Sequence, residues 1–383
     1  MLQGQSNAVL FWHGSDSARG SYDTAFGHFH RPLLVLTGLA ETQVNFVADR
    51  YGESAHSLAA GTFTYQLPGS DDAWLNPDAS GARRADPASW GDGTHMRALR
   101  RYSQAQQGAL PRDRPWLLIR MHSEYDSTLG TAEQSGLYDP ANREFVKRWR
   151  AALGRPTPLL PVFFVPVPFA RNTQAGALEA IRAAWNGMAW EPAQNAHLAL
   201  GSSLDAEDRG DGSHWSSAAA DRVALRMGIR IARWLWENGY AANDLEWLPT
   251  LGPRIISAHR VAGQPNRLDL RIGHDKGNDL VVPPRPDLKA FLVSDNGAAR
   301  TVVAVRRQAP DRLRLELDTA LGGPAAQVLV DYGLWASYAG PSTQITDNWH
   351  LLPKPVLAQQ AGVDRVPMIL CQMPGPIIAV NER

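Results

Sequence analysis

The chain has 383 residues, more than one ordinary domain, and its 44% apolar and 20% charged content is typical of a globular protein with large cores. Lysine plus arginine and aspartate plus glutamate number 38 each, so no overall charge attracts nucleic acid or an anionic membrane. The single cysteine, Cys371, excludes an intramolecular disulfide, and no apolar stretch approaches the roughly 20 residues of a membrane-spanning helix.

The first motif is the string Gln3-Gly4-Gln5-Ser6-Asn7. A small residue beside a serine at the end of a strand lets the hydroxyl project from a tight turn, where a base can reach it. Only Met1 and Leu2 precede the motif, so we expect a first strand that is either truncated or vestigial. No signal peptide can be read from such a start, and the localisation stays open between secreted, periplasmic and cytoplasmic.

Residues 8–86 are rich in glycine, serine, aspartate and aromatic residues, which predicts a loop-rich insertion with strands at 32–37 and 61–67. His28-Phe29-His30 would place two imidazoles on one face of a strand, which makes a metal site the minor alternative. No third ligand stands at a readable spacing, so we expect these histidines to lie in loop packing and predict no metal.

Beyond residue 90, helical and strand patterns alternate. The predicted strands cover 116–121, 159–165 and 197–200, and the predicted helices cover 95–107, 141–153, 175–185 and the stretch after Ser216. Strands separated by helices of this length imply parallel crossovers and a sheet covered on both faces. Ligands bind beyond the carboxyl ends of the strands in such sheets, and the motifs of this chain follow those ends.

The second motif is Asp211-Gly212-Ser213-His214. Its carboxylate and imidazole are three residues apart, so one loop can hold both, with the carboxylate orienting the ring toward a serine. The helix that follows carries arginines between its apolar residues, and we interpret them as a solvated face rather than a nucleic-acid surface: Arg222, Arg226, Arg230 and Arg233.

Past residue 247 the hydrophobic period changes from helical to alternating. Strands are predicted at 255–260, 267–272, 290–294, 302–306, 312–317 and 327–332, which together indicate a small antiparallel β-sandwich like the accessory domains of polysaccharide-active enzymes. Repeated prolines after residue 346 predict an irregular tail. The predicted domains are therefore 1–247, 248–345 and 346–383.

In this order, and with these elements between them, the Ser6 and Asp211–His214 motifs resemble the SGNH/GDSL hydrolase superfamily, in particular its sialate O-acetylesterase-like and carbohydrate acetylesterase branch. The resemblance covers roughly residues 1 to 240. It implies an α/β fold class, a three-layer α/β/α domain with a parallel sheet. It also implies Ser6 as nucleophile, His214 as base and Asp211 as the acid that orients the base.

The same resemblance implies an oxyanion hole built from the backbone of Gly91 or Gly93 together with Asn7 or His122. Relatives carry a Gln-Gly-Glu-x-Asp-like block where this chain has His122-Ser123-Glu124-Tyr125-Asp126, so the histidine and the serine are departures from the pattern. Glu124 competes with Asp211 as the partner of the base.

Two further residues, Gln5 and Trp215, are candidates for contacting the sugar, and packing of Trp215 against the sheet is the alternative.

The sequence thus predicts a serine esterase that removes acetyl groups from a carbohydrate without a metal or organic cofactor. One alternative is a non-catalytic or weakly active carbohydrate-binding or structural protein on the same fold. Another is an esterase for non-carbohydrate esters. Neither nucleic acid nor a membrane is an expected partner, and the sugar and the oligomeric state stay open.

Overall fold

The computed structural model describes residues 2–4, 25–44, 75–76, 86–106, 111–121, 132–165, 176–199, 204–210, 214–333, 340–371, 373 and 375–381. The chain divides into two compact units. The first comprises Met1–Gly14, Phe46–Leu198 and Gly210–His214, and the second comprises Ser15–Asn45, Ala199–Arg209 and Trp215–Arg383. No helix among the described residues is long and apolar enough to span a bilayer.

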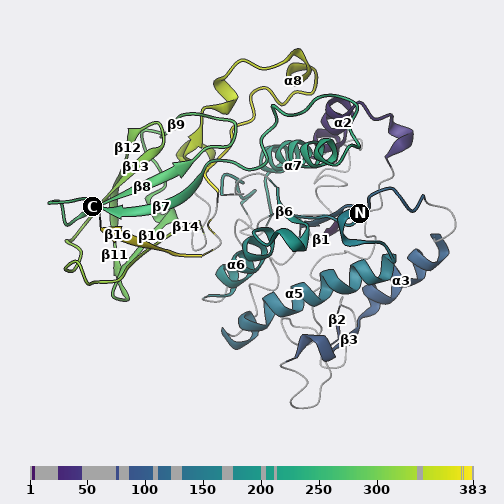
Figure 1. Ribbon diagram of the computed structural model, residues 1–383, viewed down its shortest axis with the longest axis horizontal. Coiled ribbons are helices and arrows are strands. Elements are labelled where there is room, and N and C mark those ends of the chain that lie inside the picture. Colours follow the sequence, from purple (N-terminus) through teal and green to yellow (C-terminus); the bar gives the residue numbers. More distant parts are fainter. Residues whose placement is uncertain are drawn as a thin grey trace. The chain divides into compact units, whose positions relative to one another are not determined.

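The first unit is built on a parallel sheet of four strands in the order β1-β4-β5-β6 (Figure 1). The strands are β1 (Leu2–Gly4), β4 (Leu118–Met121), β5 (Val162–Phe164) and β6 (Ala196–Leu198). Helices alternate with these strands along the chain, so the α/β class is confirmed. The strands predicted at 116–121, 159–165 and 197–200 are confirmed too, with shorter bounds.

Three helices accompany this sheet: α3 (Thr94–Gln106), α5 (Ala132–Leu153) and α6 (Ala177–Ala189). Helices α5 and α6 lie on one face of it, because the Arg120 guanidinium of β4 stands 4.1 Å from the Phe145 ring of α5, and Phe164 of β5 stacks on Trp185 of α6 at 5.3 Å. A short antiparallel pair, β2 (Leu75–Asn76) with β3 (Gly91–Asp92), precedes α3.

Helix α5 begins earlier than predicted and runs through Pro140. The prediction began the helix after this proline, because a proline inside a helix removes a hydrogen bond and costs roughly 3 kcal/mol. Its buried stripe continues on both sides of the proline, with Tyr138 at 1% and Phe145 at 0% exposure. Burial of this apolar face outweighs the local penalty.

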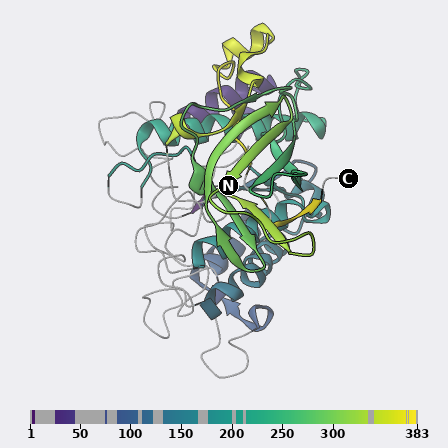
Figure 2. The ribbon, with the colours of Figure 1, turned by 90° about the vertical axis from the view of Figure 1, so that its left-hand side faces the viewer.

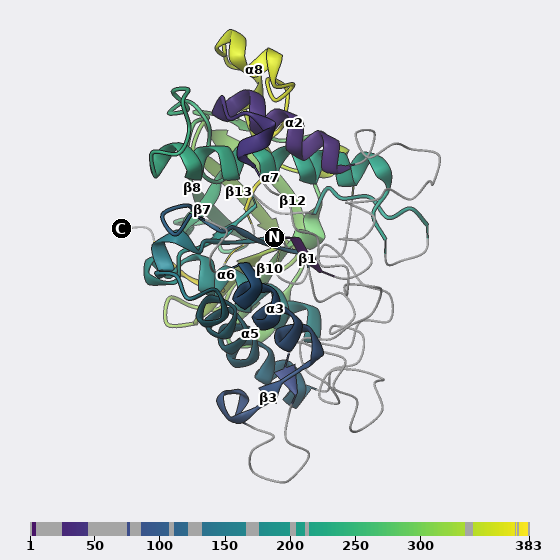
Figure 3. The same cartoon turned by 90° about the vertical axis from the view of Figure 1, so that its right-hand side faces the viewer.

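The second unit contains two helices that lie along one another, α2 (Ala25–Thr37) and α7 (Ser217–Glu237) (Figures 1 and 3). The strand predicted at 32–37 is therefore wrong. Phe29, Leu33 and Leu36 of α2 are at most 3% exposed, a spacing that forms one helical stripe. The helices approach closely at Gly228, where an added Cβ would lie 3.3 Å from the Phe29 carbonyl oxygen.

The second unit also contains an eight-stranded sheet in the order β11-β10-β14-β16-β7-β8-β13-β12, with curved strands (Figure 2). All neighbours are antiparallel except β16 and β7. The strands are β7 (Arg254–Arg260), β8 (Arg267–Gly273), β10 (Phe291–Asp295), β11 (Ala298–Arg300), β12 (Val302–Ala309), β13 (Arg312–Leu317), β14 (Val328–Tyr332) and β16 (Ile377–Asn381). All six strands predicted between 255 and 332 are confirmed.

The end of the chain is more ordered than the predicted irregular tail. It supplies β16, which inserts between β14 and β7 and joins the two halves of the sheet. The remaining short elements are β9 (Leu280–Val281), β15 (Thr346–Asp347), α8 (Val356–Gln360), and the 3-10 turns η1 (Glu41–Gln43), η3 (Pro87–Ser89), η4 (Thr157–Leu159), η5 (Pro192–Gln194), η6 (Leu288–Ala290), η7 (Pro341–Thr343) and η8 (Trp349–Leu351).

A buried carboxylate, Asp331, lies in β14 with 5% exposure. One carboxylate oxygen accepts the backbone N–H of Tyr332 at 2.7 Å, and the other has no hydrogen-bond partner among the described residues. Burial raises the pKa of Asp331 to about 6. The folded state therefore holds this proton more tightly than the unfolded chain does.

Asp331 should make stability fall as the pH rises. An unfolded aspartate titrates near pH 3.9, so the contribution of this group is complete below about pH 4 and is lost through pH 6. Between these limits we expect Asp331→Asn to gain up to about 3 kcal/mol in unfolding free energy relative to the wild type. Urea titrations at several pH values measure this. Asp311→Asn, at a half-exposed turn between β12 and β13, serves as the control. A pH-independent difference between wild type and Asp331→Asn would contradict the assignment.

Candidate active site

The carboxyl ends of β1 and β4 lie side by side in the parallel sheet. Their register pairs Leu2 with Ile119 and Gly4 with Met121, so both strands end at the same edge. Predicted site residues follow both ends in the sequence and, like Asp211, lie outside the described residues: Gln5, Ser6, Asn7, His122 and Glu124. The described part of the site is therefore its strand scaffold.

The two candidate oxyanion-hole glycines flank Asp92. The Asp92 carboxylate accepts a hydrogen bond from Arg148 of α5 at 3.1 Å and another from Arg100 of α3. The carbonyl of Gly93 accepts the N–H of Arg97 and begins α3. These contacts fix Gly91 and Gly93 beside the flank of α5.

Among the described residues, no hydrogen bond joins Gly91 or Gly93 to the strand ends at Gly4 and Met121. The role of either glycine in an oxyanion hole stays a prediction.

His214 and Trp215 stand directly before α7. His214 is partly buried and Trp215 is 5% exposed, which favours packing over sugar contact for the tryptophan. The loop that carries the Asp211–His214 motif is closed at its base, because Asp208 forms an antiparallel bridge with Trp215 and the Glu207 carbonyl accepts the Ser216 N–H at 2.7 Å. The Ser216 hydroxyl caps α7 by accepting the N–H of Ala219, as predicted.

Two arginines of α7 hold the base of this loop. Arg226 donates from both terminal nitrogens to the two oxygens of Asp205 at 2.7 and 2.6 Å. Arg222 donates to the Asp205 carbonyl at 2.8 Å and to the Glu207 carboxylate. The segment that leads into the Asp211–His214 motif is therefore fixed to the first turns of the helix that follows it.

The interpretation of these arginines as a solvated face is wrong. Arg226 is 2% and Arg230 7% exposed, and burial lowers the pKa of Arg230 to about 10. Arg233 donates to the carbonyls of Leu245 and Leu248, each at 3.2 Å. The helical pattern could not reveal this, because the partners lie in segments outside the helix.

A buried cation under the end of β4 was not predicted as functional. Arg120 is fully buried, and its Nε donates to the side-chain oxygen of Asn142 at 3.1 Å. Its guanidinium also lies over the Phe145 ring. Arg120 comes two residues before His122 in the sequence. The signal in the sequence is a charged residue inside the apolar run 116–121.

The histidine pair of residues 28 and 30 lies in α2 and not in a strand. Residues two apart on a helix are separated by about 200°, so the two rings do not share a face. His28 Nε2 lies 3.7 Å from the Asp221 carboxylate, and burial lowers the pKa of His30. The described residues contain no group of three or more His, Cys, Asp or Glu side chains that could hold a metal ion.

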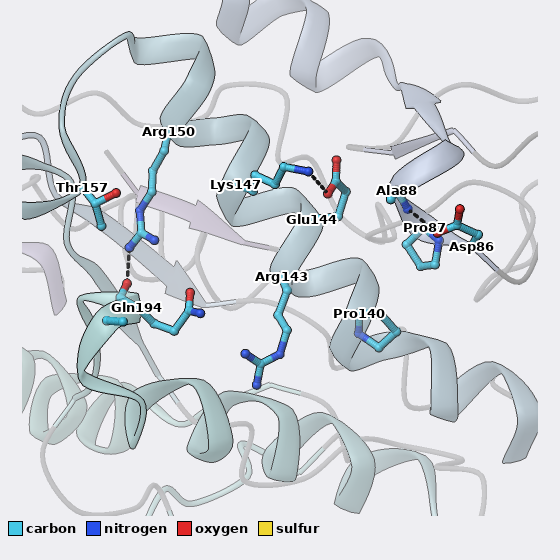
Figure 4. Close-up of a pocket in the computed structure, with 11 residues that line it drawn as sticks. Asp86, Pro87, Ala88, Pro140, Arg143, Glu144, Lys147, Arg150, Thr157 and Gln194 are labelled. Carbon is cyan, nitrogen blue, oxygen red and sulfur yellow. Dashed lines mark hydrogen bonds and ion pairs between the residues drawn. The ribbon is translucent and has the colours of Figure 1, made fainter.

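The described residues of the first unit form a hollow of about 580 Å³ along α5 (Figure 4). It is lined by Asp86, Pro87, Ala88, Pro140, Arg143, Glu144, Lys147, Arg150, Thr157, Ala193 and Gln194. Thr157 precedes β5, and Ala193 and Gln194 precede β6. The hollow therefore reaches the amino ends of these strands, opposite to the ends where Gly4 and Met121 lie.

No protein-family model and no curated protein matches this chain. Among solved structures, a carbohydrate acetylesterase from Xanthomonas citri is similar at 16% identity and a TM-score of 0.42, over 68% of this chain and 50% of that one. The chain thus spans half the length of that protein.

The bacterial S-layer protein SbsC is similar at 12% identity and a TM-score of 0.19, over 62% of this chain and 29% of that one. The N-terminal part of the same S-layer protein is similar at 10% identity and a TM-score of 0.20, over 75% of this chain and 55% of that one. Similarities this distant do not establish a family, so the function is inferred below from the chain's own residues.

The Asp205–Arg226 pair should carry far more stability than an exposed ion pair such as Arg271 with Asp311. Both side chains are 2% exposed, so Asp205→Ala leaves a buried guanidinium unpaired and should cost about 3 to 5 kcal/mol in unfolding free energy. Asp311→Ala, which removes the partner of the exposed Arg271, is the control and should cost at most about 1 kcal/mol. Urea denaturation measures both.

A second variant separates the charge effect from lost packing. Asp205→Leu combined with Arg226→Met removes both charges and should recover part of the stability that Asp205→Ala loses. Equal costs for Asp205→Ala and Asp311→Ala would show that the pair does not hold the loop.

Proposed function

We propose that this protein is a serine esterase that removes acetyl groups from a carbohydrate. The observation that carries the proposal is the parallel register of Gly4 with Met121. Ser6 follows Gly4 by two residues, and His122 follows Met121 directly. The nucleophile motif and the block that begins at His122 therefore both follow strands that end at the same edge of the sheet.

Ligands of α/β proteins bind at this edge, beyond the carboxyl ends of the parallel strands. Both segments that carry the proposed triad, Met1–Gly14 and Gly210–His214, belong to the unit that contains this sheet.

In the proposed reaction, Ser6 attacks the ester carbonyl while His214 takes its proton, and Asp211 or Glu124 holds the imidazole in the useful tautomer. The backbone N–H groups of Ser6 and of Gly91 or Gly93, with Asn7 or His122, stabilise the oxyanion. Water then releases acetate by the same steps in a second half-reaction.

The buried Arg120 supports this chemistry electrostatically. A cation in a site from which water is excluded stabilises negative charge more strongly than one in bulk water. Its guanidinium is held by Asn142 and Phe145 on α5, so it does not need to move when charge develops.

The finer fold belongs to the same proposal: a three-layer SGNH-hydrolase-like domain followed by a β-sandwich. Four parallel strands with intervening helices support the first part. For the second part, residues from both halves of the eight-stranded sheet share one core, including Leu313 and Leu315 of β13 and Val328 and Val330 of β14. The carbohydrate as substrate rests on the resemblance of the motifs and requires direct measurement.

Hydrolysis of p-nitrophenyl acetate by the full chain and by Ser6→Ala tests the nucleophile. We expect Ser6→Ala to lose at least about a thousandfold in kcat, since the oxyanion hole alone leaves only residual catalysis. Ser342→Ala, at an exposed serine of η7, should keep the wild-type rate. Acetate release from acetylated xylan and O-acetylated sialic acid then tests the substrate class.

Three outcomes would contradict the proposal. Wild-type activity in Ser6→Ala would remove Ser6 as the nucleophile. A folded but inactive wild-type chain would favour the non-catalytic carbohydrate-binding alternative, and activity on p-nitrophenyl acetate without release from either acetylated sugar would favour another ester.

A further inference from the structure

One end of the hollow along α5 contains an arginine that is held rigidly but not neutralised. Arg150 donates from Nε to the Leu160 carbonyl at 3.2 Å and from Nη2 to the carbonyls of Gln194 and Asn195. These carbonyls belong to the segments that lead into β5 and β6. Three backbone acceptors thus fix the plane of the guanidinium.

Arg150 has no carboxylate partner among the described residues. Its second terminal nitrogen, Nη1, makes no hydrogen bond to them either. Burial lowers the pKa of Arg150 to about 10, which leaves the group charged at neutral pH. Guanidinium groups that are partly removed from water usually have an anion beside them. Arg150 lines the hollow without such an anion among the described residues.

The other cations of the hollow are already paired. Arg143 binds Asp139 at 2.9 Å and Glu191 at 2.7 Å, and Lys147 binds Glu144 at 3.0 Å. Among the described lining residues, Arg150 is therefore the cation whose charge no carboxylate neutralises.

Two neutral donors stand near Arg150. Figure 4 shows Thr157 beside the Arg150 side chain and Gln194 on the side toward which that side chain extends. The Thr157 hydroxyl has no hydrogen-bond partner among the described residues. The Gln194 amide nitrogen donates to Glu191 at 3.3 Å, which leaves one of its two hydrogens for a ligand.

We propose that this end of the hollow binds a small carboxylate, of the kind carried by a uronic acid unit of a polysaccharide, through Arg150, Thr157 and Gln194. The Nη1 N–H groups of Arg150 can donate to one carboxylate oxygen, and Thr157 and Gln194 can donate to the other. One uncompensated cation matches a monoanion, whereas a phosphate dianion calls for a second free cation. The hollow is open enough for the sugar ring, whose hydroxyl groups can reach the polar lining of α5.

The site involves no covalent step and lies at the opposite end of the strands from the proposed esterase centre. The binding of a carboxylate therefore does not depend on the esterase proposal, whereas the choice of a sugar acid rests on its carbohydrate substrate. Hydrolysis of p-nitrophenyl acetate, measured in parallel, should be the same for the variants below as for the wild type.

Binding is tested by the thermal midpoint of the full chain in sodium galacturonate, with galactose and ionic-strength-matched sodium chloride as controls. A ligand that binds the folded state raises the midpoint with its concentration. We expect galacturonate to raise it and both controls to leave it unchanged. Arg150→Met should weaken binding at least about tenfold, since a charge-assisted hydrogen bond is lost. Lys289→Met, which removes an exposed lysine of η6 that does not line the hollow, should bind as the wild type does.

An equal rise with galactose or sodium chloride would overturn the proposal, as would an unchanged rise in Arg150→Met. Arg150 also holds three carbonyls, so that variant could fail to fold. Arg150→Lys and Thr157→Val then carry the test. Weaker galacturonate binding in both variants supports the site, and wild-type binding in both overturns it.

Discussion

The parallel pairing of β1 with β4 is the constraint on which the proposed chemistry depends. A shift of one residue in β4 would turn each of its side chains to the other face of the sheet. Arg120 resists such a shift, because its guanidinium reaches Asn142 and Phe145 on the α5 face. Moving it to the other face would leave a buried charge without these partners, at a cost of several kcal/mol. A buried arginine thus fixes which residues end the strand.

Buried guanidinium groups recur in this chain, and each is compensated differently. Arg226 faces a carboxylate with both terminal nitrogens, whereas Arg120 has an amide oxygen and an aromatic ring among its partners. Arg150 has only backbone carbonyls. A carboxylate cancels the charge of its partner, and carbonyl dipoles orient a charge without cancelling it. This difference separates an arginine that locks a loop from one that can still attract an anion.

Strands and helices with a regular hydrophobic repeat were predictable, because the residues that the repeat places on one face are the ones that the fold buries. The alternating run of β13 and the serine cap of α7 are examples. Where the two conflict, the prediction failed. Residues 32–37 read as a strand, yet the stripe of Phe29, Leu33 and Leu36 packs as a helix against α7. The insertion of β16 was unpredictable for a related reason, since five residues after a proline-rich stretch gain their order from β7 and β14.

The candidate site also has parts that local sequence pattern predicts and parts that it does not. Motif order predicted that serine and histidine segments belong with the parallel sheet, because connectivity and strand direction follow from local pattern. Arg120 and Arg150 could not be predicted, because their significance comes from partners 22 and 10 residues away or more. Arg150 joins α5 to the amino ends of β5 and β6, while the proposed catalytic residues follow the carboxyl ends of β1 and β4. The two ends of the strands in a parallel sheet have different roles. Loops at the carboxyl ends vary in sequence and contain the catalytic residues, whereas short connections at the amino ends hold polar groups in fixed positions. A rigid cation at the amino edge is therefore suited to holding an anionic ligand in a fixed position.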